Sequence, residues 1–112
     1  MDIEEVLKVL RPVLADPSIL KIGQNLKYDL KVLKRYDAPV HPIDDTMLMS
    51  YALDSGLGGH GMDELAERHL SHKCVSIKEL IGSGKSAITF DRVDVDKAAH
   101  YAAEDADVTL RL

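Results

Sequence analysis

Apolar residues recur at helical spacing along most of this sequence, and only two short apolar runs have the character of strands. The spacing predicts amphipathic helices over residues 3–15, 25–36, 47–53, 62–70 and 77–81, and a last helix that starts at a cap, Asp94 or Asp96, and continues to residue 112. The runs at 20–23 and 40–43 predict short parallel strands. The sequence therefore predicts an α/β fold that is mostly helical, with a small sheet.

Cap and turn residues separate these elements. Residues 44–46 are good N-cap types for the helix that follows them, so we expect Asp45 to act as a cap before we consider it for a functional site. The segment 55–61, SGLGGHG, is too rich in glycine for regular structure and predicts a loop.

The helix that follows residue 24 places a carboxylate among apolar side chains. At about 100° per residue, Asp29 falls in the same arc as Leu26, Leu30 and Leu33, and Asn25 projects the same way. A charged group that faces a core needs a partner, a metal ion or a raised pKa, because its desolvation is costly. An ion-paired or amide-bound aspartate is the ordinary alternative.

The last helix repeats this arrangement. Tyr101, Asp105, Val108 and Leu112 follow one helical stripe, so Asp105 also has apolar neighbours. Two helices that each carry an inward carboxylate could form half of a divalent-metal site, because oxygen ligands suit Mg²⁺ or Mn²⁺.

Composition narrows the possible functions. The 112 residues are enough for one domain, which we expect to span 1–112. The net charge of −5 argues against binding nucleic acid through bulk electrostatics. No apolar run approaches the roughly 20 residues of a membrane span, and the N-terminal residues lack the pattern of a signal peptide. The single Cys74 cannot form an internal disulfide, so we expect a reducing cytoplasm.

Two local motifs look like binding sites but lack essential parts. The string IGSGKS at 81–86 resembles a phosphate-binding loop, but Glu79 occupies the place of the first glycine. His69, His72 and Cys74 are closely spaced, yet a structural zinc site needs a fourth ligand and no second cluster is offered. We therefore expect these three residues to be surface or capping groups.

Four segments together carry a family resemblance: GQNLKYD at 23–29, DDTMLMSYAL at 44–53, MDELAERHL at 62–70 and YAAEDADVTL at 101–110. They resemble, in the family's order, the 3′–5′ exonuclease domain of bacterial DNA polymerase I. That family belongs to the DEDD exonuclease superfamily, and the resemblance implies a ribonuclease H-like fold. It covers nearly the whole chain, and the motifs N-x-x-x-D and Y-x-x-x-D are specific when they occur together.

The resemblance also implies roles for individual residues. Asp29 and Asp105 would be metal-binding carboxylates, and Tyr101 would orient the attacking water. Gln24 and Asn25 would lie along a single-stranded DNA 3′ end. The family's reaction is a two-metal hydrolysis with Mg²⁺ or Mn²⁺.

The sequence departs from the family at its start. Family members carry a D-x-E motif on an early strand, which supplies two more metal ligands. Asp2 and Glu4 have this spacing but lead directly into a helix, so we do not expect them to be that pair. The chain resembles a partial, truncated exonuclease domain, which implies little activity in isolation. An exposed sheet edge near 20–22 would then favour a homodimer.

Two alternatives stay open. Ribonuclease D-like exoribonucleases combine the same two motifs, so the substrate could be RNA. A catalytically silent interaction module, with Asp29 and Asp105 held in salt bridges, is the alternative of a different class.

Overall fold

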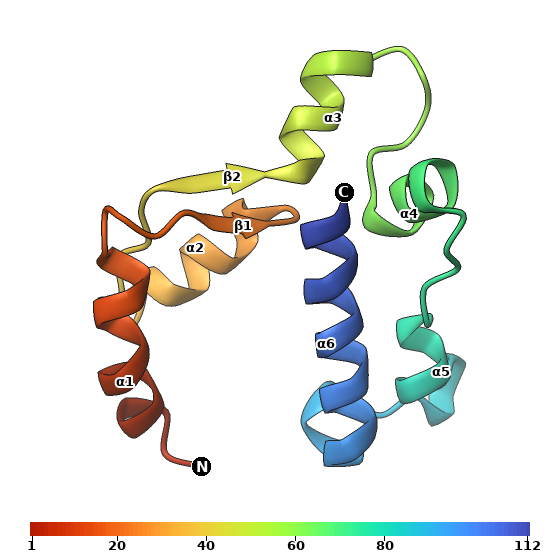
Figure 1. The fold of residues 1–112 in the computed structure, drawn as a ribbon. Coiled ribbons are helices and arrows are strands. Elements are labelled where there is room, and N and C mark those ends of the chain that lie inside the picture. Colours follow the sequence, from red (N-terminus) through yellow and green to blue (C-terminus); the bar gives the residue numbers. More distant parts are fainter. The chain divides into compact units, whose positions relative to one another are not determined.

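Six α-helices, two short strands and two single turns of 3₁₀ helix form along the 112 residues, all of which this computed structural model describes (Figure 1). In chain order the elements are α1 (Ile3–Ala15), β1 (Lys21–Gly23), α2 (Leu26–Lys34), β2 (Ile43–Asp45), α3 (Thr46–Asp54), α4 (Met62–Leu70), α5 (Ile77–Ile81), η1 (Gly84–Ser86), η2 (Phe90–Arg92) and α6 (Val95–Arg111). The chain divides into two units, Met1–His60 and Gly61–Leu112. The first holds the elements from α1 to α3, and the second holds those from α4 to α6.

In the first unit, α1 starts at a capping residue and is bonded to the connection between α2 and β2. The side chain of Asp2 accepts the backbone N–H of the residue two positions later at 3.0 Å. Arg11 donates to the backbone carbonyl of Tyr36 at 2.7 Å, and the carbonyl of Leu14 accepts the N–H of His41 at 3.0 Å. These bonds hold the end of α1 beside the chain that leads into the sheet.

The two strands form a small parallel sheet. Lys21 lies opposite Ile43, and Gly23 lies opposite Asp45. Because parallel strands end at the same edge, the start of α2 and the start of α3 come close together. The sheet therefore brings two helix N-termini to one place.

Asp45 connects these two N-termini. Its carboxylate accepts the backbone N–H groups of Asn25 at 3.0 Å and Leu26 at 2.8 Å, at the start of α2. It also accepts those of Met47 at 2.9 Å and Leu48 at 3.5 Å, at the start of α3. Only 7% of Asp45 is exposed, so these bonds satisfy a buried charge. The sequence prediction that Asp45 is a cap is confirmed.

The second unit is organised around α6. Both α4 and α5 pack against this helix. Its N-cap is Asp94, which accepts the N–H of Lys97 at 3.3 Å. The buried residues of the unit are Leu65, Ala66, Val93, Val108 and Thr109. Side chains of α4 and α6 thus form most of the core of the second unit. This packing fixes which face of α6 is turned towards α4.

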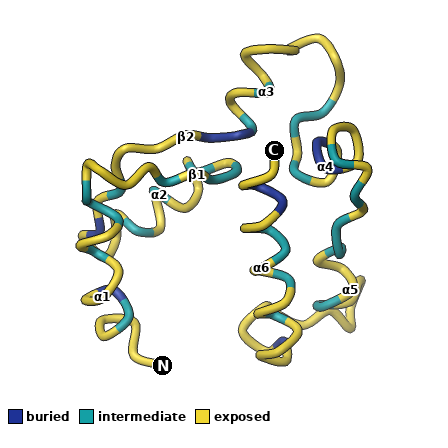
Figure 2. The backbone as a smooth tube through the Cα atoms, in the orientation of Figure 1, coloured by how far each residue is buried: buried dark blue, intermediate teal, exposed yellow.

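Few residues are buried, as the short dark blue stretches of the tube in Figure 2 show. The buried apolar residues of the first unit are Leu7 and Ala38. Many large apolar side chains are exposed, among them Leu20 at 48% and Ile22 at 43% beside and within β1.

The predicted fold class is confirmed, because the chain is mostly helical with one small parallel sheet. Three helices lie where the sequence pattern places them, at 3–15, 62–70 and 77–81. The second strand lies later than the predicted 40–43. Pro39 and Pro42 have no backbone N–H to donate, so regular pairing begins only after them. None of the helices is long and apolar enough to cross a membrane.

Candidate functional site

Asp105 and Tyr101 share one face of α6, one helical turn apart. Asp105 is partly buried, and its Oδ1 atom is buried without a hydrogen-bond partner. Burial, together with the negative charges of Glu104 and Asp63, raises the pKa of the Asp105 carboxyl above its usual value. The inward carboxylate that the sequence predicts on the last helix is therefore present.

The groups around Asp105 are also acidic. Burial raises the pKa of the Tyr101 phenol, and the charges of Asp105 and Asp63 raise it further. Burial also raises the pKa of the Cys74 thiol, and the charges of Asp63 and Glu104 raise it further. A buried carboxylate oxygen without a donor, in a region of negative potential, fits a bound cation. This environment of Asp105 therefore suits the divalent metal ion that the sequence predicts.

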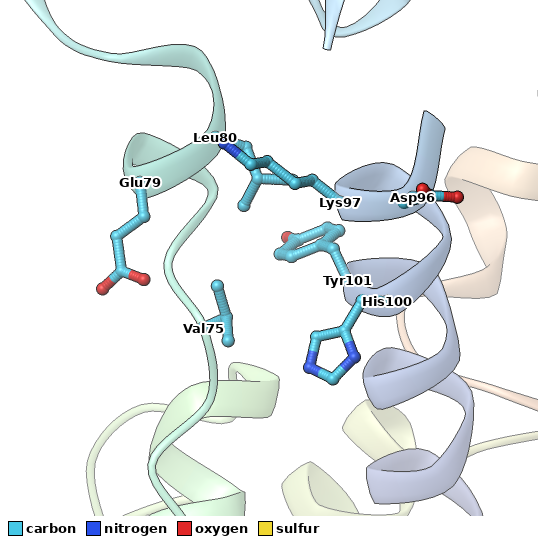
Figure 3. Close-up of a pocket in the computed structure, with 7 residues that line it drawn as sticks. All are labelled: Val75, Glu79, Leu80, Asp96, Lys97, His100 and Tyr101. Carbon is cyan, nitrogen blue, oxygen red and sulfur yellow. The ribbon is translucent and has the colours of Figure 1, made fainter. Parts of the chain in front are cut away.

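The ring of Tyr101 also lines an open pocket of about 370 Å³ between α5 and the first turns of α6. Figure 3 shows Tyr101 and His100 projecting from α6 towards the side of Val75 and Leu80. Phe90 lies on Tyr101 at a ring-centroid distance of 6.2 Å in a tilted arrangement. The phenol is thus held by apolar contacts in a recess that is open to solvent.

Gln24, Asn25 and Asp29 lie together at the start of α2, in the first unit, whereas Tyr101 and Asp105 lie in the second. Asp29 is exposed in this structure. The expectation that it faces a core is wrong here, because the half of the apolar arc that carries it is uncovered. Val32 and Tyr36, which share that half, are 38% and 36% exposed.

The backbone of Asn25 takes a left-handed conformation, with φ of 55°. Asparagine tolerates this conformation better than most residues do. Its side chain makes no capping bond to α2 and is exposed, while its own N–H is bonded to Asp45. Asp45 therefore fixes the position from which the side chain of Asn25 projects.

Both ends of the Gln24 side-chain amide are bonded within the first unit. Its Nε2 donates to the carbonyl of His60 at 2.9 Å, and its Oε1 accepts the hydroxyl of Thr46. His60 in turn bonds Ser50 through Nδ1 at 2.8 Å and lies edge-on to Tyr51. The side chain of Gln24 thus holds the end of the glycine-rich loop next to β1 and α3.

Sequence reasoning missed Asp63 and Glu104 as neighbours of Asp105. In the sequence, Asp63 is an ordinary acidic residue in the first turn of a helix. Glu104 is one of several charged residues on α6. The sequence feature that could have indicated Asp63 is the segment 62–70, because this segment carries part of the family resemblance and contains Asp63.

Comparison with known proteins gives consistent results. A family model described as 3′–5′ exonuclease matches residues 1–112. DNA polymerase I of Rhizobium leguminosarum is 56% identical over 108 residues, which are 96% of this chain and 11% of that protein. DNA polymerase I of Pseudomonas aeruginosa is 45% identical over 115 residues, which cover 100% of this chain and 13% of that protein. The chain thus spans only a small part of the length of these relatives.

A crystal structure of the EXD2 exonuclease domain soaked in Mn is 25% identical, and the alignment covers 93% of this chain and 52% of that one. Its TM-score of 0.33 is too low for positions to be compared between the two structures. The family model, in contrast, matches the whole chain. The chain belongs to the 3′–5′ exonuclease family.

Proposed function

We propose that this chain forms part of a 3′–5′ exonuclease site that hydrolyses nucleotides from single-stranded 3′ ends of DNA. The observation that carries the proposal is the buried, unpartnered Oδ1 of Asp105, one turn from Tyr101 on α6. In a family of 3′–5′ exonucleases, a carboxylate in this state is a natural metal ligand. The relatives are bacterial proteins, which supports a bacterial cytoplasm as the location.

In this proposal Asp105 and Asp29 hold Mg²⁺ or Mn²⁺. Bound divalent ions would supply a water of lowered pKa and would stabilise charge on the attacking and leaving oxygens. Asp105 is suited to this role because its charge is poorly compensated within the chain. Asp29 is suited because it is exposed. Its carboxylate takes part in none of the observed hydrogen bonds, so a metal ion would displace no partner.

Tyr101 would orient the attacking water. A tyrosine phenol keeps its proton at neutral pH, and the raised pKa of Tyr101 favours this form further, so the group can donate a hydrogen bond as well as accept one. Asn25 would contact the DNA strand through its exposed side chain. Gln24 would act with it, although its amide is bonded to His60 and Thr46, so any contact requires an exchange of these bonds.

The chain offers two of the four carboxylates that its family resemblance implies. Asp2 caps α1, and Glu4 pairs with Arg11 at 3.2 Å, so neither is free in this structure to act as the missing pair. We therefore propose that residues 1–112 are part of one exonuclease domain and have little nuclease activity alone. Groups that act together in a metal site lose most of their effect when some are absent.

Manganese binding tests the assignment of Asp105. We expect Asp105→Asn to weaken Mn²⁺ binding by at least about tenfold, because the substitution removes an anionic ligand. Electron paramagnetic resonance of free Mn²⁺ measures this directly. Asp107→Asn is the matched control, because Asp107 lies on the same helix but is paired with Arg111 at 3.3 Å. Equal affinities for the wild type and Asp105→Asn would contradict the proposal.

The choice of nucleic acid is tested separately. Fluorescence anisotropy with matched single-stranded DNA and RNA should show tighter binding of DNA, and Asn25→Ala should weaken it. Tighter binding of RNA would favour the ribonuclease D-like alternative. Binding of neither, together with unchanged metal affinity in Asp105→Asn, would favour the catalytically silent interaction module.

Self-association is part of the same proposal. Each strand of the two-stranded sheet has one unpaired edge, and the apolar side chains of Leu20 and Ile22 are exposed beside it. These features support a homodimer that pairs strand edges. Sedimentation at micromolar concentration should then show a dimer, and a strictly monomeric chain would contradict it.

A further inference from the structure

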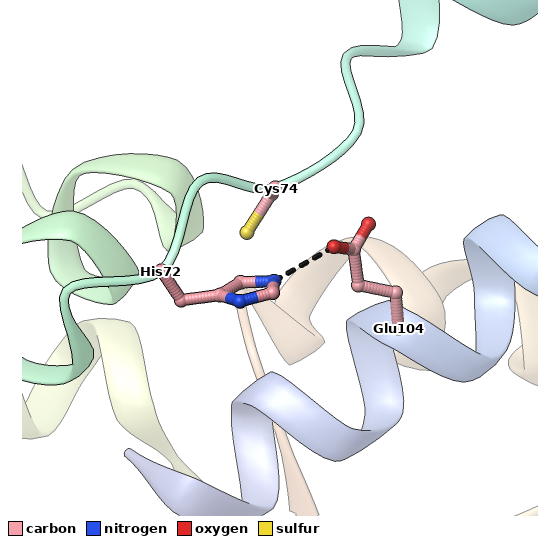
Figure 4. Close-up of side chains that lie close together, drawn as sticks. All are labelled: His72, Cys74 and Glu104. Atoms are coloured by element: carbon pink, nitrogen blue, oxygen red, sulfur yellow. Dashed lines mark hydrogen bonds and ion pairs between the residues drawn. The ribbon is translucent and has the colours of Figure 1, made fainter.

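A second group of metal-binding side chains lies in the second unit. His72 and Cys74 belong to the segment without regular secondary structure between α4 and α5. Glu104 projects from α6 towards them, as Figure 4 shows. One donor atom from each of the three residues lies within 4.8 Å of the other two. A nitrogen and a sulfur donor two positions apart are thus joined by an oxygen donor that lies 30 positions beyond Cys74 in the sequence.

The backbone around this group is held in place. Ser71 ends α4 in the left-handed conformation, with φ of 52°, and the N–H of His72 bonds the carbonyl of Ala66 at 3.2 Å. Glu104 bonds His72 Nε2 at 2.8 Å through one oxygen and the N–H of Val75 at 2.9 Å through the other. The donors are therefore ordered before any ion binds, which lowers the entropic cost of binding.

The donors also suit a cation by charge. Cys74 is partly buried, and the charges of the Asp63, Glu104 and Asp105 carboxylates act on its thiol. The imidazoles of His72 and His100 are near Glu104, and His72 Nε2 is hydrogen-bonded to its carboxylate at 2.8 Å. A divalent ion bound by these donors would compensate the negative potential directly.

We propose that His72 Nε2, Cys74 Sγ and a Glu104 carboxylate oxygen bind one thiophilic divalent cation of the zinc type, with water in the fourth position. Nitrogen and thiolate donors favour Zn²⁺ over Mg²⁺, so the site differs in kind from the oxygen site proposed for Asp29 and Asp105. Binding replaces the bond between His72 and Glu104 by two bonds to the ion. The Cys74 thiol loses its proton to solvent, and His72 binds as the neutral tautomer that carries its proton on Nδ1 and leaves Nε2 unprotonated.

The inference goes beyond the proposed nuclease and does not depend on it. The ion would tie the segment between α4 and α5 to α6, and so would stabilise the second unit by linkage. A sequence pattern could not show this site, because His72 and Cys74 alone lack further ligands and Glu104 comes from a distant helix.

Cobalt titration of the full chain, without an affinity tag, tests the proposal. We expect one equivalent of Co²⁺ to bind with a thiolate-to-cobalt charge-transfer band and with visible bands of four-coordinate intensity, and we expect Zn²⁺ to displace it. Cys74→Ser should remove the charge-transfer band, and His72→Gln should weaken binding by at least about tenfold. His69→Gln is the matched control, because His69 is an exposed histidine of α4 outside the group.

Calorimetry in buffers of different ionisation enthalpy provides a second measurement. Zn²⁺ binding should release about one proton per ion if the thiol ionises. Circular dichroism of both variants shows whether they keep their helices, and Glu104→Gln supplies a further variant if one does not. The absence of a charge-transfer band in the folded wild type, or an unchanged band in Cys74→Ser, would overturn the proposal and leave a hydrogen-bonded His72–Glu104 pair beside a free thiol.

Discussion

Two carboxylates, one in each unit, differ in how far the surrounding chain satisfies them. Asp45 is buried and accepts four backbone N–H groups from the starts of two helices. Asp105 is partly buried, has one oxygen without a partner, and has Glu104 and Asp63 as charged neighbours. The first carboxylate is compensated by the chain itself, whereas the second is not.

This difference separates a structural aspartate from a candidate functional one. Burial alone does not make the distinction, since Asp45 is the more buried residue. What matters is whether donors are supplied, because an uncompensated charge is costly and persists where something else compensates it. The comparison therefore predicts opposite effects on stability when the two charges are removed.

The largest effect is expected for Asp45. Asp45→Ala removes the acceptor for the N-termini of α2 and α3 and leaves their N–H groups unsatisfied at a buried position. Two lost caps at about 1 to 2 kcal/mol each predict a decrease in the free energy of unfolding of about 2 to 4 kcal/mol. Urea denaturation followed by circular dichroism measures it.

Asp44→Ala is the matched control for this prediction, because Asp44 is the neighbouring aspartate and is exposed. Its substitution should change stability little. If both variants lost the same free energy of unfolding, the negative charge in β2 would stabilise the chain, and the capping bonds of Asp45 would not.

A smaller effect of opposite sign is expected for Asp105, measured in EDTA so that no metal contributes. Because the pKa of its carboxyl is raised in the folded chain, the stability that Asp105 contributes is present below about pH 3.8 and is lost as pH rises through the folded pKa. Asp105→Asn should therefore increase the free energy of unfolding at pH 7, by much less than Asp45→Ala decreases it, because solvent screens the charge of a partly exposed carboxylate.

The pH dependence is the more specific part of this prediction. The advantage of Asp105→Asn should shrink as pH falls towards 3.8, where the wild-type carboxyl takes up its proton. A destabilised Asp105→Asn at pH 7 in EDTA would show that the carboxylate has donors that the structure does not reveal, and would remove the contrast with Asp45.

Local patterns predicted the helices well where spacing and caps agree. Pro17 two residues past Ala15 gives the end of α1, and Gly82 gives the end of α5. The cap role of Asp45 also followed from local chemistry. That it caps α2 as well could not be predicted, because this depends on the parallel pairing of β1 with β2.

The site could be predicted only in part, for the same reason. Helical periodicity identifies Asp105 and Tyr101 on one face, but it gave the wrong environment for Asp29, because periodicity does not tell which half of an apolar arc is covered. Glu104 and Asp63 join Asp105 and Cys74 through packing of α4 and α6. Such contacts between distant segments leave no local signal in a single sequence.

The smallest effect is expected for a third carboxylate, which is satisfied like Asp45 but lies in an accessible turn. Asp16 accepts the hydroxyl of Ser18 at 2.6 Å and its N–H at 2.8 Å, and these bonds, the hydroxyl first, lower the pKa of Asp16. The stability it contributes is therefore present above about pH 3.8 and is lost as pH falls through the folded pKa. Ser18→Ala should raise the pKa of Asp16 towards its usual value in an NMR titration, while the melting temperature at pH 7 falls only slightly, since water can replace the lost donor. If Ser18→Ala destabilised the chain as much as Asp45→Ala, hydrogen bonding alone would set the energy of these carboxylates, and burial would contribute nothing to the contrast between Asp45 and Asp105.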